Sequence, residues 1–102
     1  MFVPRKASLG EFEQLVLLAI LRLSDQAFGV GIRRELEKRA HRTVSRGEFY
    51  ATLDRLEAKK LIHWQTEPPT ENRGGIPQRR YEVTKVGISA LSASRNTLLN
   101  MW

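Results

Sequence analysis

The side chains best suited to binding another molecule are arginines at a predicted helix start and beside a glycine-rich loop. Arg46 begins the helical run RGEFYATLDRLEAKKL, and Arg55 lies further along it. Arg73 precedes Gly74 and Gly75 in the loop PPTENRGGIP. A guanidinium group presents several donors in a fixed plane, which suits phosphate and carboxylate oxygens. Two more arginines, at 79–80, follow this loop. These positions together favour contact with an anion. The alternative is that the loop is a simple connection that contacts no ligand.

The sequence contains no constellation typical of catalysis or metal binding. His41 and His63 are isolated, cysteine is absent, and no serine, histidine and aspartate share a catalytic spacing. General acid–base catalysis and metal coordination need such groups to be held together. We therefore expect no enzymatic activity, no cofactor and no metal.

The net charge of the chain indicates which kind of partner it can bind. Seventeen Lys and Arg against eleven Asp and Glu give a net charge of +6, which favours nucleic acid or an anionic membrane surface. No run of about 18 apolar residues is present, and no predicted helix joins a strong apolar face to a lysine-rich one. The first ten residues, MFVPRKASLG, lack the apolar region of a secretory signal. We expect a cytoplasmic protein without a membrane role.

Two nearly identical stretches, SLGEF at 8–12 and SRGEF at 45–49, each predict a helix start. Serine three residues before glutamate is the capping-box pattern, in which the serine oxygen and the glutamate carboxylate each accept a backbone N–H. An apolar residue before each cap can also pack against the fourth helical residue. The pairs expected to do so are Ala7 with Phe12 and Val44 with Phe49. One capping solution thus occurs twice, ahead of two different helices.

The first of these helices is apolar on nearly all sides. Every residue from Leu15 to Leu21 is apolar, whereas a helix with one buried stripe alternates with polar residues. We expect one side to pack in the core of the chain and the other against a second copy of the protein. The alternative is a central helix wrapped entirely by its own domain.

The second helix has one apolar face and an unusual outer face. Phe49, Leu53 and Leu56 share a side at 100° per residue, while Gly47 and Ala51 lie opposite with Arg46 and Arg55 near them. Small residues permit close approach to a flat or grooved surface, and the helix N-terminus favours phosphate. The alternative is that a glycine in the first turn is simply tolerated.

The remaining segments complete a winged-helix pattern. A short amphipathic helix is predicted from about Gly29 to Ala40, and the alternating stretches 61–67 and 78–84 predict two strands around the loop 68–77. Thr84 is the predicted cap of a last helix. The fold class is α+β and mostly α: a winged helix-turn-helix with a two-stranded wing and an additional C-terminal dimerisation helix. We expect one domain over 1–102, with the DNA-binding part at about 8–84 and the dimerisation helix at about 85–102.

The order and spacing of these segments resemble the PadR family of bacterial transcriptional regulators. The segments that carry the resemblance are GEFEQLVLLAIL, FGVGIRREL, SRGEFYATLDRLEAKKLI and RRYEVTKVGISAL, within residues 8–92. The resemblance implies a homodimeric repressor of palindromic double-stranded DNA sites, often relieved by a small aromatic or drug-like effector. The sequence departs from the family at Lys60, where many members have glycine at the end of the recognition helix, and in its short last helix.

The resemblance also assigns residues. It implies DNA contacts at or near Arg46, Gly47, Tyr50, Ala51 and Arg55, and wing contacts at Arg73, Gly74 and Gly75. It implies a dimer interface containing Leu15, Leu18, Leu91, Leu98 and Trp102. The competing hypothesis is a winged-helix module that binds another protein and no DNA, which the acidic residues Glu48 and Asp54 near the proposed face favour.

Overall fold

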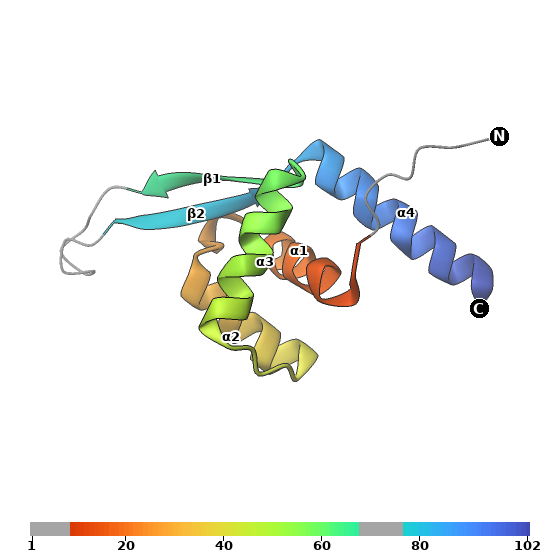
Figure 1. Cartoon of the computed structure of the whole chain (residues 1–102), viewed down its shortest axis with the longest axis horizontal. Coiled ribbons are helices and arrows are strands. Elements are labelled where there is room, and N and C mark those ends of the chain that lie inside the picture. Colours follow the sequence, from red (N-terminus) through yellow and green to blue (C-terminus); the bar gives the residue numbers. More distant parts are fainter. Residues whose placement is uncertain (1–8, 68–76) are drawn as a thin grey trace.

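The computed structural model describes residues 9–67 and 77–102, and Figure 1 shows their arrangement. The elements are α1 (Glu11–Leu23), a 3-10 turn (Ser24–Gln26), α2 (Gly29–Ala40), α3 (Arg46–Ala58), β1 (Ile62–Glu67), β2 (Gln78–Val83) and α4 (Lys85–Met101). The predicted order of three helices, two strands and a final helix is confirmed. The chain has the winged-helix fold, with a two-stranded wing and an additional C-terminal helix.

Helix α1 begins two residues later than its capping-box pattern predicts. Gly10 is the cap, and its N–H donates to Glu13 Oε1 at 3.0 Å. The predicted cap at Ser8 and glutamate at Glu11 are therefore wrong. The carboxylate of Glu13 also accepts from Lys59 Nζ at 2.9 Å, so a contact with α3 helps to fix the start of α1. The predicted staple through Ala7 lies outside the described residues.

The core lies where α1 meets the other helices and the base of the wing. Its fully buried side chains include Val16 and Leu17 of α1, Ile32 of α2, and Phe49 and Leu56 of α3. Burial of each such side chain stabilises the fold by roughly 1.5–3 kcal/mol. This shared core fixes α2 and α3 against α1, so the two helices of the helix-turn-helix unit hold a set angle.

The wing pairs β1 and β2 in antiparallel register, with Trp64 opposite Tyr81 and Thr66 opposite Arg79. Side chains alternate between the two faces of a strand. Trp64, Tyr81 and Arg79 therefore lie on one face of the wing, and Arg80 lies on the other. A bridge between Phe28 and Arg80, with Tyr81 N–H donating to the Ala27 carbonyl at 2.9 Å, joins β2 to the start of α2.

Helix α3 ends without a glycine. Lys60 takes a left-handed φ of 63°. Its N–H donates to the Glu57 carbonyl at 2.8 Å, and the N–H of Leu61 donates to the Leu56 carbonyl at 3.0 Å. This is the paired hydrogen-bond pattern of a Schellman motif, with Leu56 and Leu61 both buried. Lysine thus adopts the conformation that suits glycine, at a cost in backbone strain.

Helix α4 leaves the body of the molecule after a tight junction, and its C-terminal end lies far from the wing (Figure 1). The Thr84 hydroxyl accepts from the Gly87 N–H at 3.0 Å, which confirms the predicted cap. A Cβ built on Gly87 would lie 2.3 Å from the Leu61 carbonyl oxygen, so only glycine fits there. The junction is therefore close-packed, whereas the far half of α4 is exposed.

Candidate nucleic-acid interface

The outer face of α3 is small and open, as its sequence predicts. The Ser45 hydroxyl accepts from the Glu48 N–H at 3.1 Å, which confirms this cap and starts the helix at Arg46. With the apolar side of α3 in the core, Gly47 and Ala51 point outward. A Cβ built on Gly47 meets no atom within 4 Å. The glycine is therefore not required by packing within the described protein.

Arg46 is held against an aromatic ring at the start of α3. Its guanidinium carbon lies 5.6 Å from the centre of the Tyr50 ring, a cation–π distance. The Tyr50 ring meets Phe49 edge-on at 5.1 Å, which anchors it to the core. The Tyr50 hydroxyl lies 2.7 Å from where a Cβ on Gly29 would be, so glycine at the start of α2 makes room for it.

Arg79 is held in the same way on the wing. Its guanidinium carbon lies 4.0 Å from the centre of the Trp64 ring, and its side chain is otherwise exposed. Burial raises the pKa of the neighbouring Tyr81 hydroxyl, and the positive charge of Arg79 opposes that rise. The sequence predicts Arg79 and Arg80 alike as arginines that flank the glycine-rich loop. It does not distinguish them, because the place of Arg79 beside Trp64 depends on the strand register.

The two arginines border one shallow hollow. It has a volume of about 380 Å³ and is lined by Phe28, Gly29, Val30, Arg46, Tyr50, Pro77, Gln78, Arg79 and Tyr81. The hollow therefore combines the N-terminus of α2 with two guanidinium groups. Backbone N–H groups and the dipole at a helix start favour negative charge. These features together suit a phosphate group.

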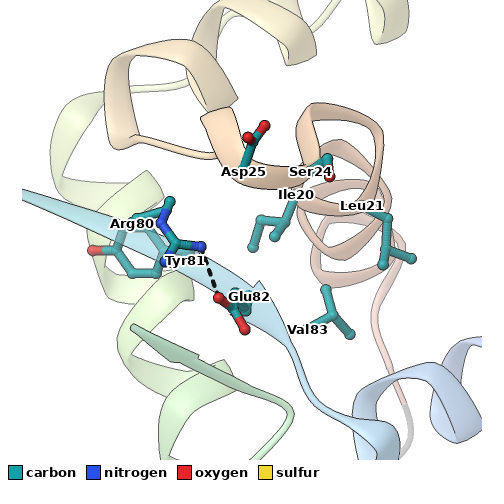
Figure 2. A pocket seen from close by; sticks show the side chains of 8 residues that line it. All are labelled: Ile20, Leu21, Ser24, Asp25, Arg80, Tyr81, Glu82 and Val83. Atoms are coloured by element: carbon teal, nitrogen blue, oxygen red, sulfur yellow. Dashed lines mark hydrogen bonds and ion pairs between the residues drawn. The ribbon is translucent and has the colours of Figure 1, made fainter. Parts of the chain in front are cut away.

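Arg80, one residue further along β2, differs from Arg79 because its guanidinium is paired with carboxylates. It donates to Glu67 at 2.6 Å and to Glu82 at 2.7 Å, and these bonds raise its pKa above the ordinary value. Figure 2 shows the Arg80–Glu82 pair at the edge of a second hollow of about 390 Å³, which Ile20 and Val83 also line. Its charge is thus compensated within the wing, which makes it a weak candidate for binding an outside anion.

The other predicted contact residues lie at different places. Arg55 is exposed and donates to Thr52 Oγ1 at 2.9 Å, so its guanidinium is turned toward the flank of α3. Arg73, Gly74 and Gly75 lie outside the described residues.

The predicted dimer residues lie on α1 and α4. Leu15 and Leu91 are half-buried against the core of the chain. Leu18, Leu98 and Trp102 are exposed to 46%, 56% and 99%. Among the described residues, apolar side chains of both helices are thus exposed.

Residues capable of catalysis or metal binding are dispersed in the described part of the chain. His41 is exposed at the end of α2, and His63 lies 3.3 Å from Glu82 on the wing. Within 9–67 and 77–102, no three His, Cys, Asp or Glu side chains gather as metal ligands would. Over the same ranges, no helix has the length and apolar character needed to cross a membrane.

Comparison with known proteins identifies the family. The model of the transcriptional regulator PadR-like family matches residues 17–93. No curated protein matches significantly. An X-ray structure of a PadR-like transcription factor from bacteroid fragilis is 25% identical, with a TM-score of 0.72 over 88% of this chain and 82% of that one. A structure described as the complex structure of hsRosR-S4 is 23% identical, with a TM-score of 0.65 over 94% of this chain and 76% of that one, and shares the fold. The chain therefore belongs to the PadR-like family of transcriptional regulators.

Proposed function

We propose that this protein is a homodimeric repressor that binds a palindromic site in double-stranded DNA. One observation carries the proposal. Arg46 and Arg79, each held against an aromatic ring, border one hollow at the start of α2, beside the small outer face of α3. A preordered guanidinium loses less conformational freedom when it binds phosphate. The arrangement favours a phosphate backbone in the hollow and α3 in the adjacent major groove.

The proposed contacts divide into two kinds. Arg46, Arg79 and the first N–H groups of α2 bind phosphates and set the position of the protein on the duplex. Gly47 and Ala51 let α3 approach the base edges closely, because neither carries more than a methyl group. Tyr50 orients Arg46, and Arg55 contacts the DNA backbone at the edge of the major groove. The wing tip, with Arg73, Gly74 and Gly75, adds further backbone contacts.

A salt titration tests DNA binding and separates it from the main alternative. Two phosphate-binding arginines per protomer amount to four in a dimer, and each contributes about −0.9 to the slope of log K against log salt. We expect a slope of about −3.6 or steeper, so affinity for a labelled duplex falls about a hundredfold between about 50 and about 200 mM salt. A flat salt dependence, or no binding at low salt, would contradict the proposal.

The proposed dimer uses the uncovered apolar side chains of α1 and α4. Leu98→Glu would place a charge in that interface, whereas Ala93→Glu changes an exposed residue of α4 about 140° away around the helix. Sedimentation should give a dimer for the parent and for Ala93→Glu, and a monomer for Leu98→Glu. A dimer of unchanged strength in Leu98→Glu would exclude this interface.

Repression would follow where the site overlaps a promoter, in the cytoplasm of a bacterial cell. Family resemblance further supports a small aromatic effector that releases the DNA by changing the spacing of the two α3 helices. An effector of this kind lowers the affinity of the dimer for its selected duplex in a competition titration. If a panel of aromatic and drug-like compounds leaves that affinity unchanged, this part of the proposal fails.

A module that binds another protein remains the second candidate. The exposed carboxylates of Glu48 and Asp54 near the outer face of α3 favour it, since both would face DNA phosphates unfavourably. Such a module predicts weak duplex binding even at low salt, so the titration above decides between the two.

A further inference from the structure

The centre of the outer face of α3 holds one ionised side chain, and it is acidic. At about 100° per residue, Gly47, Ala51, Asp54 and Ala58 fall within an arc of about 60° opposite the buried side. All four are exposed. Asp54 lies about 10 Å, or two turns, beyond Gly47 along the helix. If α3 enters the major groove, this arc faces the base edges.

The arginines of α3 lie away from that centre. Arg46 is drawn over the Tyr50 ring, and Arg55 is turned back to Thr52. Asp54, by contrast, forms no hydrogen bond or ion pair with any residue in the described ranges 9–67 and 77–102. Its side chain is exposed, so its carboxylate oxygens can accept hydrogen bonds from a ligand.

A carboxylate discriminates among the bases because it only accepts hydrogen bonds. Guanine presents two acceptors in the major groove, N7 and O6, which repel it. Adenine offers the N6 amino group beside the acceptor N7, whereas cytosine offers the N4 amino group with no acceptor of its own beside it. Cytosine is thus the base that an aspartate prefers.

The reach of aspartate is short, so this contact needs the helix backbone to lie close to the bases. Gly47 and Ala51 permit that approach on the same arc, and a Cβ on Gly47 would meet open space. The small residues and the carboxylate therefore act together. Gly47 and Ala51 let α3 enter the groove deeply enough for the Asp54 carboxylate to reach a base. A bare run of small residues would leave no hydrogen-bond readout at the centre of the face.

We infer that Asp54 determines specificity for a cytosine in each half-site of the DNA. This inference rests on the proposed function, since it takes α3 to be the groove-reading helix. It also reassigns a residue that otherwise counts against DNA binding. Repulsion between the carboxylate and DNA phosphates lowers the affinity for DNA in general. A hydrogen bond from the cytosine N4 amino group offsets this loss only at sites that present that group.

The test compares the base preferences of variants selected from one random duplex library. Asp54→Asn keeps the shape but can pair with N6 and N7 of adenine, so one position per half-site should change from cytosine to adenine. Asp54→Ala should lose preference at that position. Replacing the cytosine in the selected duplex should weaken the parent about ten- to hundredfold and Asp54→Ala less than about threefold.

Glu37→Gln is the matched control. It removes the same charge from an exposed position on α2, so it should raise general affinity for DNA while leaving every base preference unchanged. Thermal unfolding of each variant verifies folding. If the parent enriches a site and Asp54→Asn enriches the same bases at every position, the inference about Asp54 is wrong and the proposed function stands. If the folded parent enriches nothing, both fail.

Discussion

Adjacent arginines on β2 offer the sharpest test of how the wing binds. Arg79 and Arg80 carry the same charge one residue apart but lie on opposite faces of the wing. Arg79 lies on the Trp64 ring, whereas Arg80 is paired with Glu67 and Glu82. If the proposed interface is correct, Arg79→Gln removes two phosphate contacts from a dimer and Arg80→Gln removes none.

The magnitude follows from the number of contacts. At about 0.9 per phosphate, Arg79→Gln should make the slope of log K against log salt shallower by about 1.8. Between about 50 and about 200 mM salt, a fourfold change, the ratio of parent to variant affinity should shrink about twelvefold. The weakening should be similar for all duplex sequences, because phosphate contacts carry no base information.

Fluorescence anisotropy with a labelled duplex at several salt concentrations measures these slopes. Arg80→Gln serves as the control: it leaves two carboxylates without their partner and lowers stability, but its slope should stay within error of the parent. Equal loss of slope in both variants would mean that the wing acts only through its overall charge. An unchanged slope in Arg79→Gln would remove Arg79 from the interface.

Four further substitutions test the fold that positions this interface. Gly87→Ala should lower stability by about 1–3 kcal/mol, seen as a fall in Tm, because its Cβ would lie 2.3 Å from the Leu61 carbonyl oxygen. Gly47→Ala is the control: its Cβ meets no atom within 4 Å, so Tm should stay unchanged or rise. Lys60→Gly should stabilise the protein by about 0.5–1 kcal/mol in urea unfolding, since it relieves the φ of 63°, and a loss of stability would contradict the strain assigned there. Burial alone would raise the pKa of Glu13, but hydrogen bonds from Lys59 and the Gly10 N–H outweigh it and lower that pKa. The stabilisation is therefore present at neutral pH and lost as pH falls through the lowered pKa, so Glu13→Gln should reduce Tm at pH 7 but not in strong acid; equal loss at both would refute an ionic role.

Helix caps could be predicted from the sequence wherever residues close in the chain form them. The caps at Ser45 and Thr84 are confirmed because a hydroxyl and a backbone N–H three residues on suffice to form them. The same pattern at Ser8 misplaced the start of α1. There the deciding carboxylate is that of Glu13, which also binds Lys59 of a distant segment, and no local pattern contains that contact.

In the candidate site, too, features set by residues close in the chain could be predicted, and features set by distant contacts could not. The small outer face of α3 follows from helical periodicity, so Gly47 and Ala51 could be placed in advance. The distinction between Arg79 and Arg80 could not, because it depends on which residues of β1 lie opposite them. The cation–π contact of Arg46 and the turn of Arg55 toward Thr52 likewise depend on side-chain conformations that spacing does not determine.

We propose above that a dimer of this chain reads a two-fold symmetric DNA site through α3. Selection from a random duplex library at roughly physiological salt, where non-specific binding is weak, tests it most directly. We expect an enriched palindrome with half-sites about one helical turn, or about 10 base pairs, apart. Absence of any enriched sequence, from protein shown to be folded, would contradict it.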